Sequence, residues 1–487
     1  MSPSQPAATA KSYSFDRFFL DGRWVTPSSA DSLDVRSPHD GSAVGSAPVA
    51  TVADVDRAVA AARRAFDDGP WPRLTVEQRI AAVRPFVEAY AARTSELAAL
   101  VSAEMGSPVE FAEAAHGIGP LMLMQQTLQF AESYAWSERR GSSALIREPA
   151  GVVGVITPWN VPQVTIIAKL LPALLAGCTV VVKPAPETPL DAMLLAGLLA
   201  EADLPPGVAA ILSGATEAGR RLVEHPGVDR IAFTGSADVG RAIASICGQR
   251  LARCSLELGG KSAAIVCQDA SIERTVAGLR FSSFLNNGQA CVAQSRILAP
   301  RSRYDEVAAA LAQAADEFVV GDPREPATDI GPLVSARQRD RVRGYIDLGV
   351  AEGATLVSGG SDPVDGLPDG QYVRPTVFRD VDNSMRIARE EIFGPVIVVI
   401  PYDGIDDAVR IANDSPYGLG GSVWTKDRNA GYDIARRVRT GMFGINSFAP
   451  EFGVPFGGFK ASGIGREYGP EAFDEYVEMK SVYGVPA

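Results

Sequence analysis

The sequence predicts an α/β protein with a doubly wound parallel sheet, a second α/β domain and a small β extension. Short apolar runs alternate with helical segments from residue 151 onward, which indicates parallel strands joined by helices. A second alternating block begins near Ser262, and residues 476–483 form an extended segment that no helix follows. The length of 487 residues favours two to four domains over a single core.

The predicted elements follow in order along the chain. Apolar residues at helical spacing predict helices over 52–66, 76–105 and 110–136. Short apolar runs predict strands at 144–148, 152–156, 179–183, 209–212, 230–233, 263–267 and 396–402. Further helices are predicted over 162–175, 189–202, 271–284 and 304–318. A C-terminal strand without a partner in its own chain often pairs with another subunit, so residues 476–483 predict self-association.

Composition and charge narrow the class of protein. The chain is 46% hydrophobic and 21% charged, which is ordinary for a soluble globular protein. Its net charge of −12 argues against nucleic acid or an anionic membrane as the main partner. The longest apolar stretch, 170–182, is too short to span a bilayer. Residues 1–14 lack the apolar core of a signal peptide and predict a disordered tail, so we expect a soluble, cytoplasmic protein.

One of the 5 cysteines stands apart from the others. Because there is no Cys-x-x-Cys pair, we expect neither a disulfide framework nor a metal site. Cys291 follows the polar turn Asn286-Asn-Gly-Gln-Ala, which is typical of a nucleophile. No histidine lies near it in sequence, so a bound cationic cofactor or backbone amides are the expected means of activation. The other four lie in apolar or helical surroundings and are expected in the core: Cys178, Cys247, Cys254 and Cys267.

Two motifs have the character of a phosphate or ribose site. In Phe233-Thr-Gly-Ser236 a strand ends at a glycine and a small hydroxyl residue before a helix begins, and free amides at a helix start bind anions. Lys183 stands at the end of a buried strand, where parallel sheets bind nucleotides. Taken alone, an ordinary strand–helix turn and a solvated lysine explain these motifs as well.

Three further motifs place polar groups in turns or apolar surroundings. Glu257 lies among leucines, which raises the pKa of a carboxyl group and suits a general base. The amide of Asn160, in Thr157-Pro-Trp-Asn160, is suited to stabilise an oxyanion. Glu391 precedes Ile-Phe393-Gly-Pro and is suited to accept ribose hydroxyls. Each motif also has a purely structural interpretation: a salt-bridged acid for Glu257, a rigid turn for the Asn160 motif and a charged loop for the Glu391 motif.

Together and in this order the motifs resemble the aldehyde dehydrogenase superfamily, over nearly the whole chain from about residue 15. The resemblance implies an NAD(P)-dependent, non-acylating enzyme. The motifs that carry it are Thr157-Pro-Trp-Asn160, Lys183-Pro184, Phe233-Thr-Gly-Ser236, Leu256-Glu257-Leu-Gly-Gly-Lys261, Gly288-Gln-x-Cys291, Glu391-Ile-Phe393-Gly-Pro and Pro455-Phe456-Gly-Gly-x-Lys460-x-Ser-Gly.

The resemblance implies a role for each catalytic position. Cys291 attacks the aldehyde carbon, and its backbone amide and Asn160 hold the oxyanion of the thiohemiacetal. Hydride transfer to the nicotinamide ring leaves a thioester, which water activated by Glu257 hydrolyses to the carboxylic acid. Lys169 and Glu467 match positions proposed to relay protons from the general base. The cationic ring then takes the place of the missing histidine in favouring the thiolate.

The resemblance also implies a set of cofactor contacts, with Lys183 at the adenine-side ribose, Ser236 at the pyrophosphate and Glu391 at the nicotinamide ribose. The full set is Ile156, Thr157, Pro158, Trp159, Lys183, Ala185, Pro186, Gly219, Phe233, Thr234, Gly235, Ser236, Val239, Leu258, Gly259, Glu391 and Phe393. Pro186 stands where many NAD-preferring members have a Glu, and Glu187 follows it. NAD is the expected cofactor, and NADP stays open. Ala237 replaces the hydroxyl residue that often follows the Gly-Ser of the family.

The expected substrate is a medium-to-large apolar or aromatic aldehyde. The helix after Asn160 carries small side chains where some relatives have bulkier ones, and three phenylalanines follow in a later loop: Phe448, Phe452 and Phe456. Two alternatives on the same fold remain, a CoA-acylating dehydrogenase, which would generally lack Glu257, and a non-catalytic binding or structural protein, which would have lost Cys291 or Glu257. A thiol hydrolase is a further alternative, against which the nucleotide motifs argue.

The implied domains are a dinucleotide-binding domain over 15–138 and 151–260 and a catalytic domain over 261–460. Oligomerisation strands are implied at 139–150 and 470–487. The expected partners are the small-molecule aldehyde and further copies of the chain, as a dimer or tetramer.

Overall fold

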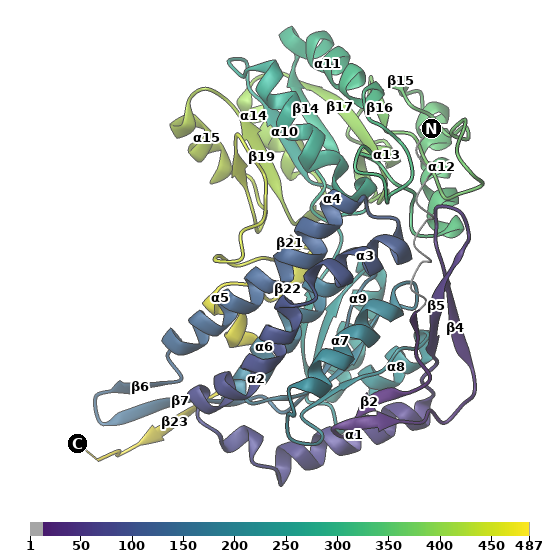
Figure 1. Ribbon diagram of the computed structural model, residues 1–487. Helices are drawn as coiled ribbons and strands as arrows, with labels where there is room; N and C mark the ends of the chain where they lie inside the picture. The colour runs from purple at the N-terminus through teal and green to yellow at the C-terminus, as the bar shows by residue number, and fades with distance from the viewer. Residues whose placement is uncertain (1–12, 487) are drawn as a thin grey trace.

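The computed structural model describes residues 13–486 and contains two large sheets, one above the other in Figure 1. The lower sheet has the order β22-β12-β11-β8-β9-β10-β2-β3. Its parallel centre consists of β8 (Val152–Ile156), β9 (Thr179–Lys183), β10 (Ala209–Ile211), β11 (Arg230–Thr234) and β12 (Arg253–Glu257). These strands are almost entirely buried, as expected for parallel strands covered by helices on both faces. The antiparallel edges are β2 (Phe18–Leu20), β3 (Arg23–Val25) and β22 (Gly463–Ile464).

The order of the central strands determines where a ligand would bind. The chain runs from β8 through β9 to β10 and then returns to place β11 on the other side of β8. Ligands of such sheets bind at the carboxyl ends of the strands where the direction reverses. The connecting helices are α6 (Pro162–Ala176), α7 (Pro189–Glu201), α8 (Thr216–Glu224) and α9 (Ala237–Arg250).

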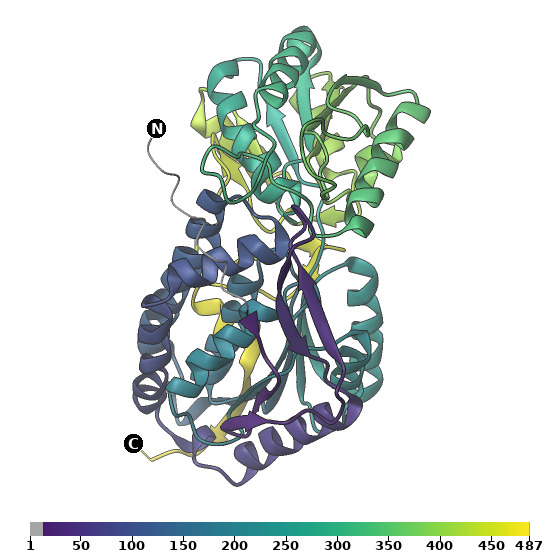
Figure 2. The ribbon, with the colours of Figure 1, turned by 45° about the vertical axis from the view of Figure 1, so that its right-hand side comes forward.

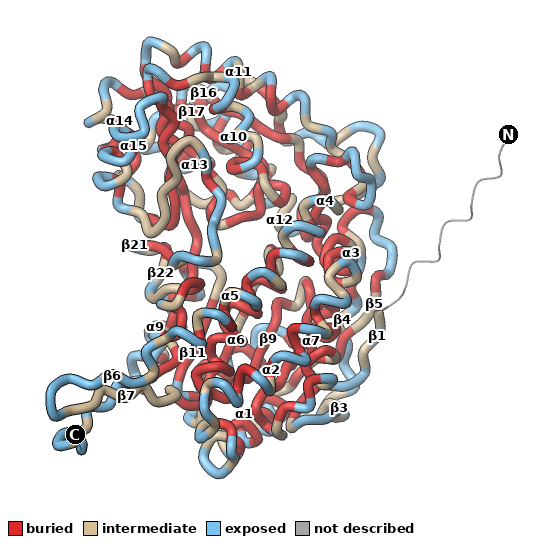
Figure 3. The backbone as a smooth tube through the Cα atoms, turned by 60° about the vertical axis from the view of Figure 1, so that its left-hand side comes forward, coloured by how far each residue is buried: buried red, intermediate tan, exposed pale blue. Residues whose placement is uncertain are grey.

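Helix α6 is buried along its whole length, as the red tube in Figure 3 shows. Its predominantly apolar sequence allows this, because α2 (Val76–Ala91) and α5 (Gly119–Ser133) cover the side that faces away from the sheet. Two of the predicted helices are interrupted. Residues 76–105 form α2 and α3 (Thr94–Met105), with a non-helical Arg93 between them, and 110–136 contains α4 (Val109–Ala112), a π-helix (Glu113–Ile118) and α5. Helix α1 (Val52–Asp67) is one residue longer than predicted.

The upper sheet has the order β15-β16-β17-β14-β13-β19-β20, and all of its pairs except β15–β16 are parallel. Its strands are β13 (Ala263–Val266), β14 (Arg296–Pro300), β15 (Thr355–Ser358), β16 (Thr376–Arg379), β17 (Val396–Tyr402), β19 (Gly421–Trp424) and β20 (Gly444–Ile445). Its helices are α10 (Ile272–Phe284), α11 (Tyr304–Asp316), α12 (Ala336–Ala351), α13 (Arg386–Arg389), α14 (Ile405–Asn413) and α15 (Arg428–Ala435). The short strands β18 (Tyr417–Gly418) and β21 (Phe459–Lys460) form a separate pair.

The C-terminal strand is not unpaired, which corrects the expectation from the sequence. Strand β23 (Val477–Tyr483) pairs antiparallel with β7 (Ser143–Pro149) of the same chain, and β6 (Ser137–Arg140) completes a three-stranded sheet. This sheet projects from the lower domain at the left of Figure 1. Among the described residues its two outer edges carry no further strand.

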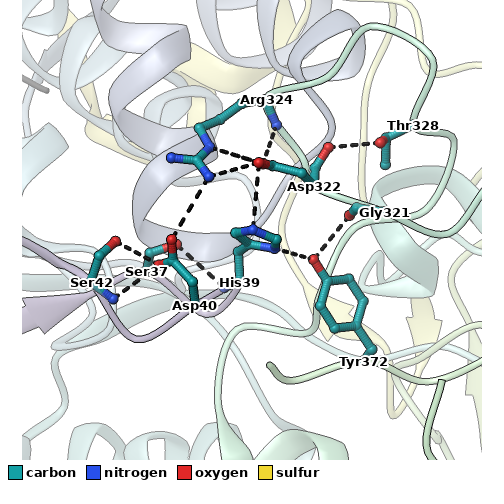
Figure 4. Close-up of polar contacts among 9 residues, drawn as sticks. All are labelled: Ser37, His39, Asp40, Ser42, Gly321, Asp322, Arg324, Thr328 and Tyr372. Atoms are coloured by element: carbon teal, nitrogen blue, oxygen red, sulfur yellow. Dashed lines mark hydrogen bonds and ion pairs between the residues drawn. The ribbon is translucent and has the colours of Figure 1, made fainter. Parts of the chain in front are cut away.

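An N-terminal β arm connects the two domains. Strands β4 (Ser32–Arg36) and β5 (Ala43–Pro48) run up the side of the molecule, in purple in Figure 2, and β1 (Tyr13–Ser14) pairs parallel with β5. Residues 13 and 14 were expected in the disordered tail, whose remaining residues, 1–12, lie outside the described residues. At the tip of the arm His39 Nδ1 lies 2.5 Å from the hydroxyl of Tyr372, and Nε2 lies 3.4 Å from Asp322 (Figure 4). These contacts tie the arm to the upper domain.

Among the described residues no helix is both long and apolar enough to cross a membrane.

Candidate active site

The turn that precedes Cys291 is held in an uncommon backbone conformation. Asn286, Asn287 and Gly288 have φ values of 52°, 62° and 71°, a left-handed run that asparagine and glycine tolerate better than other residues. The Asn287 amide nitrogen donates to the carbonyl oxygens of Gly106 and Pro332, both at 2.9 Å. The predicted turn therefore exists, and buried polar contacts from both domains fix its shape.

Asn160 belongs to the same network as the turn that precedes Cys291. Its side-chain Nδ2 donates to the carbonyl oxygen of Gln289 at 2.9 Å, and the Asn286 amide donates to the Asn160 carbonyl at 2.8 Å. Asn160 is buried. The second N–H of its amide makes no hydrogen bond among the described residues, so it is available to a ligand.

Cys291 is half-buried. Burial raises its pKa to about 12, and the carboxyl groups of Glu391 and Glu257 add to the rise. A cation placed beside the sulfur would reverse this effect, because an opposite charge favours the ionised form. None of the histidines among the described residues lies in the turn that carries Cys291, where one could act as a base. His116 lies in the π-helix, His225 follows α8, and His39 is at the tip of the β arm.

Glu257 lies at the carboxyl end of β12, and both of its carboxyl oxygens are enclosed without a hydrogen-bond partner among the described residues. Burial raises its pKa well above the usual value, and Glu467 adds to the rise while Lys169 opposes it. The thiol of Cys291 feels the charge of Glu257, so the two groups lie within electrostatic reach. An unpartnered carboxyl group of this kind is a strong proton acceptor once ionised.

A buried ion pair, Lys169 with Glu467, lies within electrostatic reach of Glu257. Lys169 Nζ lies 2.5 Å from Glu467 Oε1 and 2.5 Å from the hydroxyl of Thr234. Both charged side chains are almost fully buried. The predicted relay residues are therefore in contact with each other, and they lie on α6 and on the C-terminal segment.

Glu391 approaches the start of the upper domain closely. Its Oε1 accepts a hydrogen bond from the Gly260 amide at 3.0 Å, and a Cβ at Gly259 would lie 2.3 Å from its Oε2. Only glycine permits this approach. Burial raises the Glu391 pKa to about 7, and Gly260, Lys261 and Arg341 oppose the rise. Phe393, at φ 64°, packs edge-on against Trp159 with ring centroids 5.4 Å apart.

The remaining predicted cofactor residues gather at the carboxyl ends of the central strands. Ser236 caps α9 by accepting from the Val239 amide at 3.4 Å, and burial lowers the pKa of Lys183 to about 8. A Cβ at Gly219 would lie 3.6 Å from Lys183 and 3.9 Å from Ile156. The others follow or flank these strand ends: Thr157, Pro158, Ala185, Pro186, Phe233, Thr234, Gly235 and Leu258.

Three residues beside the site were not predicted to take part. The carbonyl oxygen of Gln289 accepts a hydrogen bond from the Asn160 amide, and the Gln289 side-chain Oε1 accepts one from the Val334 amide at 3.0 Å. Lys261 is fully buried with an unpartnered Nζ, and burial lowers its pKa to about 7. Tyr468 packs against the rings of Phe452 and Phe456, and Phe456 packs against the same buried cluster as Cys291. Tyr468 follows Glu467 directly, but no sequence signal marks it, because its contacts come from a distant loop.

Among the residues that the structure describes, no group of three or more His, Cys, Asp and Glu side chains is placed to hold a metal ion.

Known proteins resemble this chain over almost its entire length. A family model described as the aldehyde dehydrogenase family matches residues 24–482. Geranial dehydrogenase of Castellaniella defragrans is 47% identical over 470 residues, which cover 96% of this chain and 98% of that protein. A 3-succinoylsemialdehyde-pyridine dehydrogenase from a Pseudomonas species is 42% identical, with coverage of 96% and 98%.

Solved structures show the same likeness. A Mycobacterium tuberculosis aldehyde dehydrogenase complexed with NAD+ superposes with a TM-score of 0.95 at 48% identity, covering 98% of this chain and 99% of that one. A mutant of aldehyde dehydrogenase C from Pseudomonas syringae, complexed with NAD+ and octanal, gives a TM-score of 0.93 at 42% identity, with 97% of each chain covered.

Proposed function

This chain belongs to the aldehyde dehydrogenase family, and from that premise we propose that it oxidises an apolar aldehyde to the carboxylic acid, with NAD+ as the oxidant and water as the acyl acceptor. It is an NAD-dependent aldehyde dehydrogenase. The observation that carries the proposal is the pairing of a half-buried thiol, Cys291, with an unpartnered buried carboxyl group, Glu257, within electrostatic reach of it. The overall reaction converts RCHO, NAD+ and H2O to RCOOH, NADH and H+.

The residues at the edge of the lower sheet fit a dinucleotide. Lys183 Nζ makes no hydrogen bond among the described residues, although the side chain is mostly buried, so it is free to bind a ribose or phosphate oxygen. A side chain larger than glycine at position 219 would reach into the space beside Lys183. The first amides of α9 are suited to bind phosphate oxygens, because a helix start leaves its N–H groups without partners. Glu391 would hold the nicotinamide ribose, and the other cofactor contacts implied by the resemblance complete the site.

In the proposed mechanism the Cys291 thiolate attacks the aldehyde carbon and forms a C–S bond. The free N–H of Asn160 and the Cys291 backbone amide bind the oxyanion of the resulting thiohemiacetal. NAD+, when bound, supplies the oxidising power by accepting a hydride from the substrate carbon, and its ring charge favours the thiolate. A thioester on Cys291 remains.

Glu257 then removes a proton from water, which adds to the thioester carbon, and the C–S bond breaks to release the acid. The environment of Glu257 suits this step, because a desolvated carboxylate has a raised pKa and binds a proton strongly. Lys169 and Glu467 lie next to it and would pass the proton on. Water is the expected acyl acceptor because coenzyme A would not require a general base at this position.

The side chains around the thiol support an apolar substrate. Ala290, Val292, Leu419 and Phe448 form a buried cluster against which Cys291 packs. Three apolar side chains at the start of α5 and in the loop after residue 450 are exposed: Ile118, Met122 and Val454. Helix α5, which follows Ile118 and carries Met122, faces the loop that carries Val454, since a Cβ at Gly119 would lie 3.7 Å from Phe452. The named relatives that act on geranial, or that were solved with octanal, are consistent with this choice.

We also propose that the chain self-associates through the sheet of β6, β7 and β23. Met479 and Tyr483 on β23 are exposed, although both are large side chains with apolar surface. The unpaired edges of the sheet are suited to pair with another copy. Sedimentation of the full chain should show a dimer or tetramer, and a monomer at micromolar concentration would refute the proposal.

Formation of reduced cofactor, followed at 340 nm with a panel of apolar aldehydes, tests the activity. Wild-type protein should turn over without coenzyme A and yield the free acid. Cys291→Ser should lose at least about 1000-fold in turnover while still binding NAD+. Unchanged turnover in Cys291→Ser, or a requirement for coenzyme A, would overturn the proposal.

A further inference from the structure

Tyr468 occupies a backbone position that disfavours it. Its φ of 60° lies in the left-handed region, which bulky residues rarely adopt. Hydrogen bonds on both sides hold it there: the Glu467 amide donates to the Phe456 carbonyl at 2.8 Å, and the Gly469 amide donates to the Phe452 carbonyl at 3.1 Å. Glycine or asparagine would adopt this conformation with less strain. A buried tyrosine at such a position costs backbone strain, so a specific role for its side chain is worth testing.

The ring of Tyr468 packs against two other aromatic rings, and we name these three residues the aromatic trio: Phe452, Phe456 and Tyr468. The Phe452 ring meets Tyr468 nearly perpendicularly, and the Phe456 ring meets it at 48°, each with centroids 5.1 Å apart. Tyr468 is buried, whereas both phenylalanines are only half-buried. Tyr468 therefore supports the two rings from behind.

The aromatic trio extends from the buried cluster against which Cys291 packs to helix α5. Phe456 packs against the same buried cluster as Cys291. At the other end Phe452 faces Gly119 at the start of α5. The cofactor-side residues Trp159 and Phe393 pack against each other and not against the trio. The trio and the Trp159–Phe393 pair are thus separate aromatic groups, and one end of the trio shares a buried cluster with Cys291.

The hydroxyl group of Tyr468 makes no hydrogen bond among the described residues, and the residue as a whole is buried. Burial and the charges of Glu467, Cys291 and Glu257 raise its pKa, which is consistent with a place near the reacting groups. The ring packing, and not the hydroxyl, connects Tyr468 to the two phenylalanines.

We propose that Tyr468 is a positioning residue that determines specificity: it fixes Phe452 and Phe456 as an aromatic wall beside Cys291. This wall selects aldehydes whose carbonyl is conjugated to a flat π system, α,β-unsaturated or aryl, over saturated aldehydes with the same carbon skeleton. A flat π system gains edge and face contacts with rings already held in place, whereas a saturated chain gains dispersion alone and must lose rotamer freedom. The inference rests on the proposed function, because it concerns the aldehyde that reaches Cys291.

Two matched substrate pairs test the inference: geranial with citronellal, and cinnamaldehyde with 3-phenylpropanal. Within each pair we compare kcat/KM for the conjugated aldehyde with kcat/KM for the saturated one. A general loss of activity lowers both values and leaves their ratio unchanged. In Tyr468→Leu this ratio should fall about two- to tenfold, mainly through a higher KM for the conjugated aldehyde, while the KM for NAD+ stays unchanged. Tyr468→Phe should keep the wild-type ratio, because it keeps the ring. Tyr432→Leu, an exposed tyrosine on α15, is the control and should also keep it.

An unchanged ratio in Tyr468→Leu would overturn the inference, and so would a Tyr468→Phe ratio that falls as far as the Leu variant. Thermal unfolding shows whether each variant folds. Should Tyr468→Leu fail to fold, Phe452→Leu removes another ring of the trio, and the ratio should fall in the same direction. If it does not, the wall is not the selecting element. Wild-type protein that oxidises none of the four aldehydes would count against the proposed function instead.

Discussion

Lys169 Nζ and Glu467 Oε1 lie 2.5 Å apart in the interior of the protein, although 298 residues separate them in the chain. The pair joins helix α6 to the C-terminal segment, and Thr234 at the end of β11 completes the contact. Removal of charged groups from water is costly, so each member of a buried pair depends on the other. The pair both anchors the C-terminal segment and places charges beside Glu257.

Glu467→Gln should destabilise the protein, because it leaves the Lys169 ammonium buried without its counter-ion. The expected loss is about 3–5 kcal/mol in the free energy of unfolding, measured by chemical denaturation. The double variant Lys169→Met/Glu467→Leu removes both charges and should recover most of this loss. Equal stability of Glu467→Gln and wild type would show that the ion pair is not maintained in solution.

Glu257→Gln should form the thioester but hydrolyse it slowly, because the amide cannot accept a proton from water. Rapid mixing with NAD+ and an aldehyde should give a burst of reduced cofactor close to one per active site, followed by slow turnover. Glu273→Gln, an exposed glutamate on α10, is the matched control and should behave as wild type. A complete absence of the burst would mean that Glu257 acts before thioester formation.

Because of Glu257, the free energy of unfolding should fall as the pH rises. The pKa of Glu257 is raised in the folded state above the ordinary value of 4.5, so the folded protein binds the proton more tightly than the unfolded chain. Stability therefore falls with increasing pH above about 4.5, where the unfolded carboxyl group ionises. Glu257→Gln should be more stable than wild type at neutral pH, and the difference should vanish near pH 4. A difference that does not change with pH would contradict the predicted shift.

Glu187 should discriminate against NADP. Its charge acts on Lys183, and it lies 3.9 Å from Arg337 across the domain boundary, next to Pro186. A carboxylate there would repel a 2′-phosphate by roughly 1 kcal/mol in a water-like medium. Glu187→Gln should raise the ratio of NADP to NAD affinity about fivefold, measured by quenching of tryptophan fluorescence, with Glu273→Gln as control. An unchanged ratio would show that Glu187 does not set the preference.

Much of the chain was predictable because the relevant signals are local. The strands over 152–156, 179–183 and 396–402 have the predicted bounds, since continuous apolar runs indicate buried parallel strands. Helix interruptions were missed because they depend on backbone geometry, as at Arg93 and in the π-helix, rather than on apolar spacing. The pairing of β23 with β7 joins segments far apart in the chain, so no local pattern predicts it.

The sequence by itself determined which groups are available for chemistry: a thiol in a polar turn, an acid among leucines and an asparagine after a strand. Tertiary structure alone decided what surrounds them, because burial and contact depend on segments distant in sequence. It gives Glu257 no hydrogen-bond partner among the described residues, pairs Lys169 with Glu467 and places Tyr468 behind two phenylalanines. Spacing along a chain specifies local backbone, whereas pKa shifts and ring packing follow from neighbours that only the folded chain brings together.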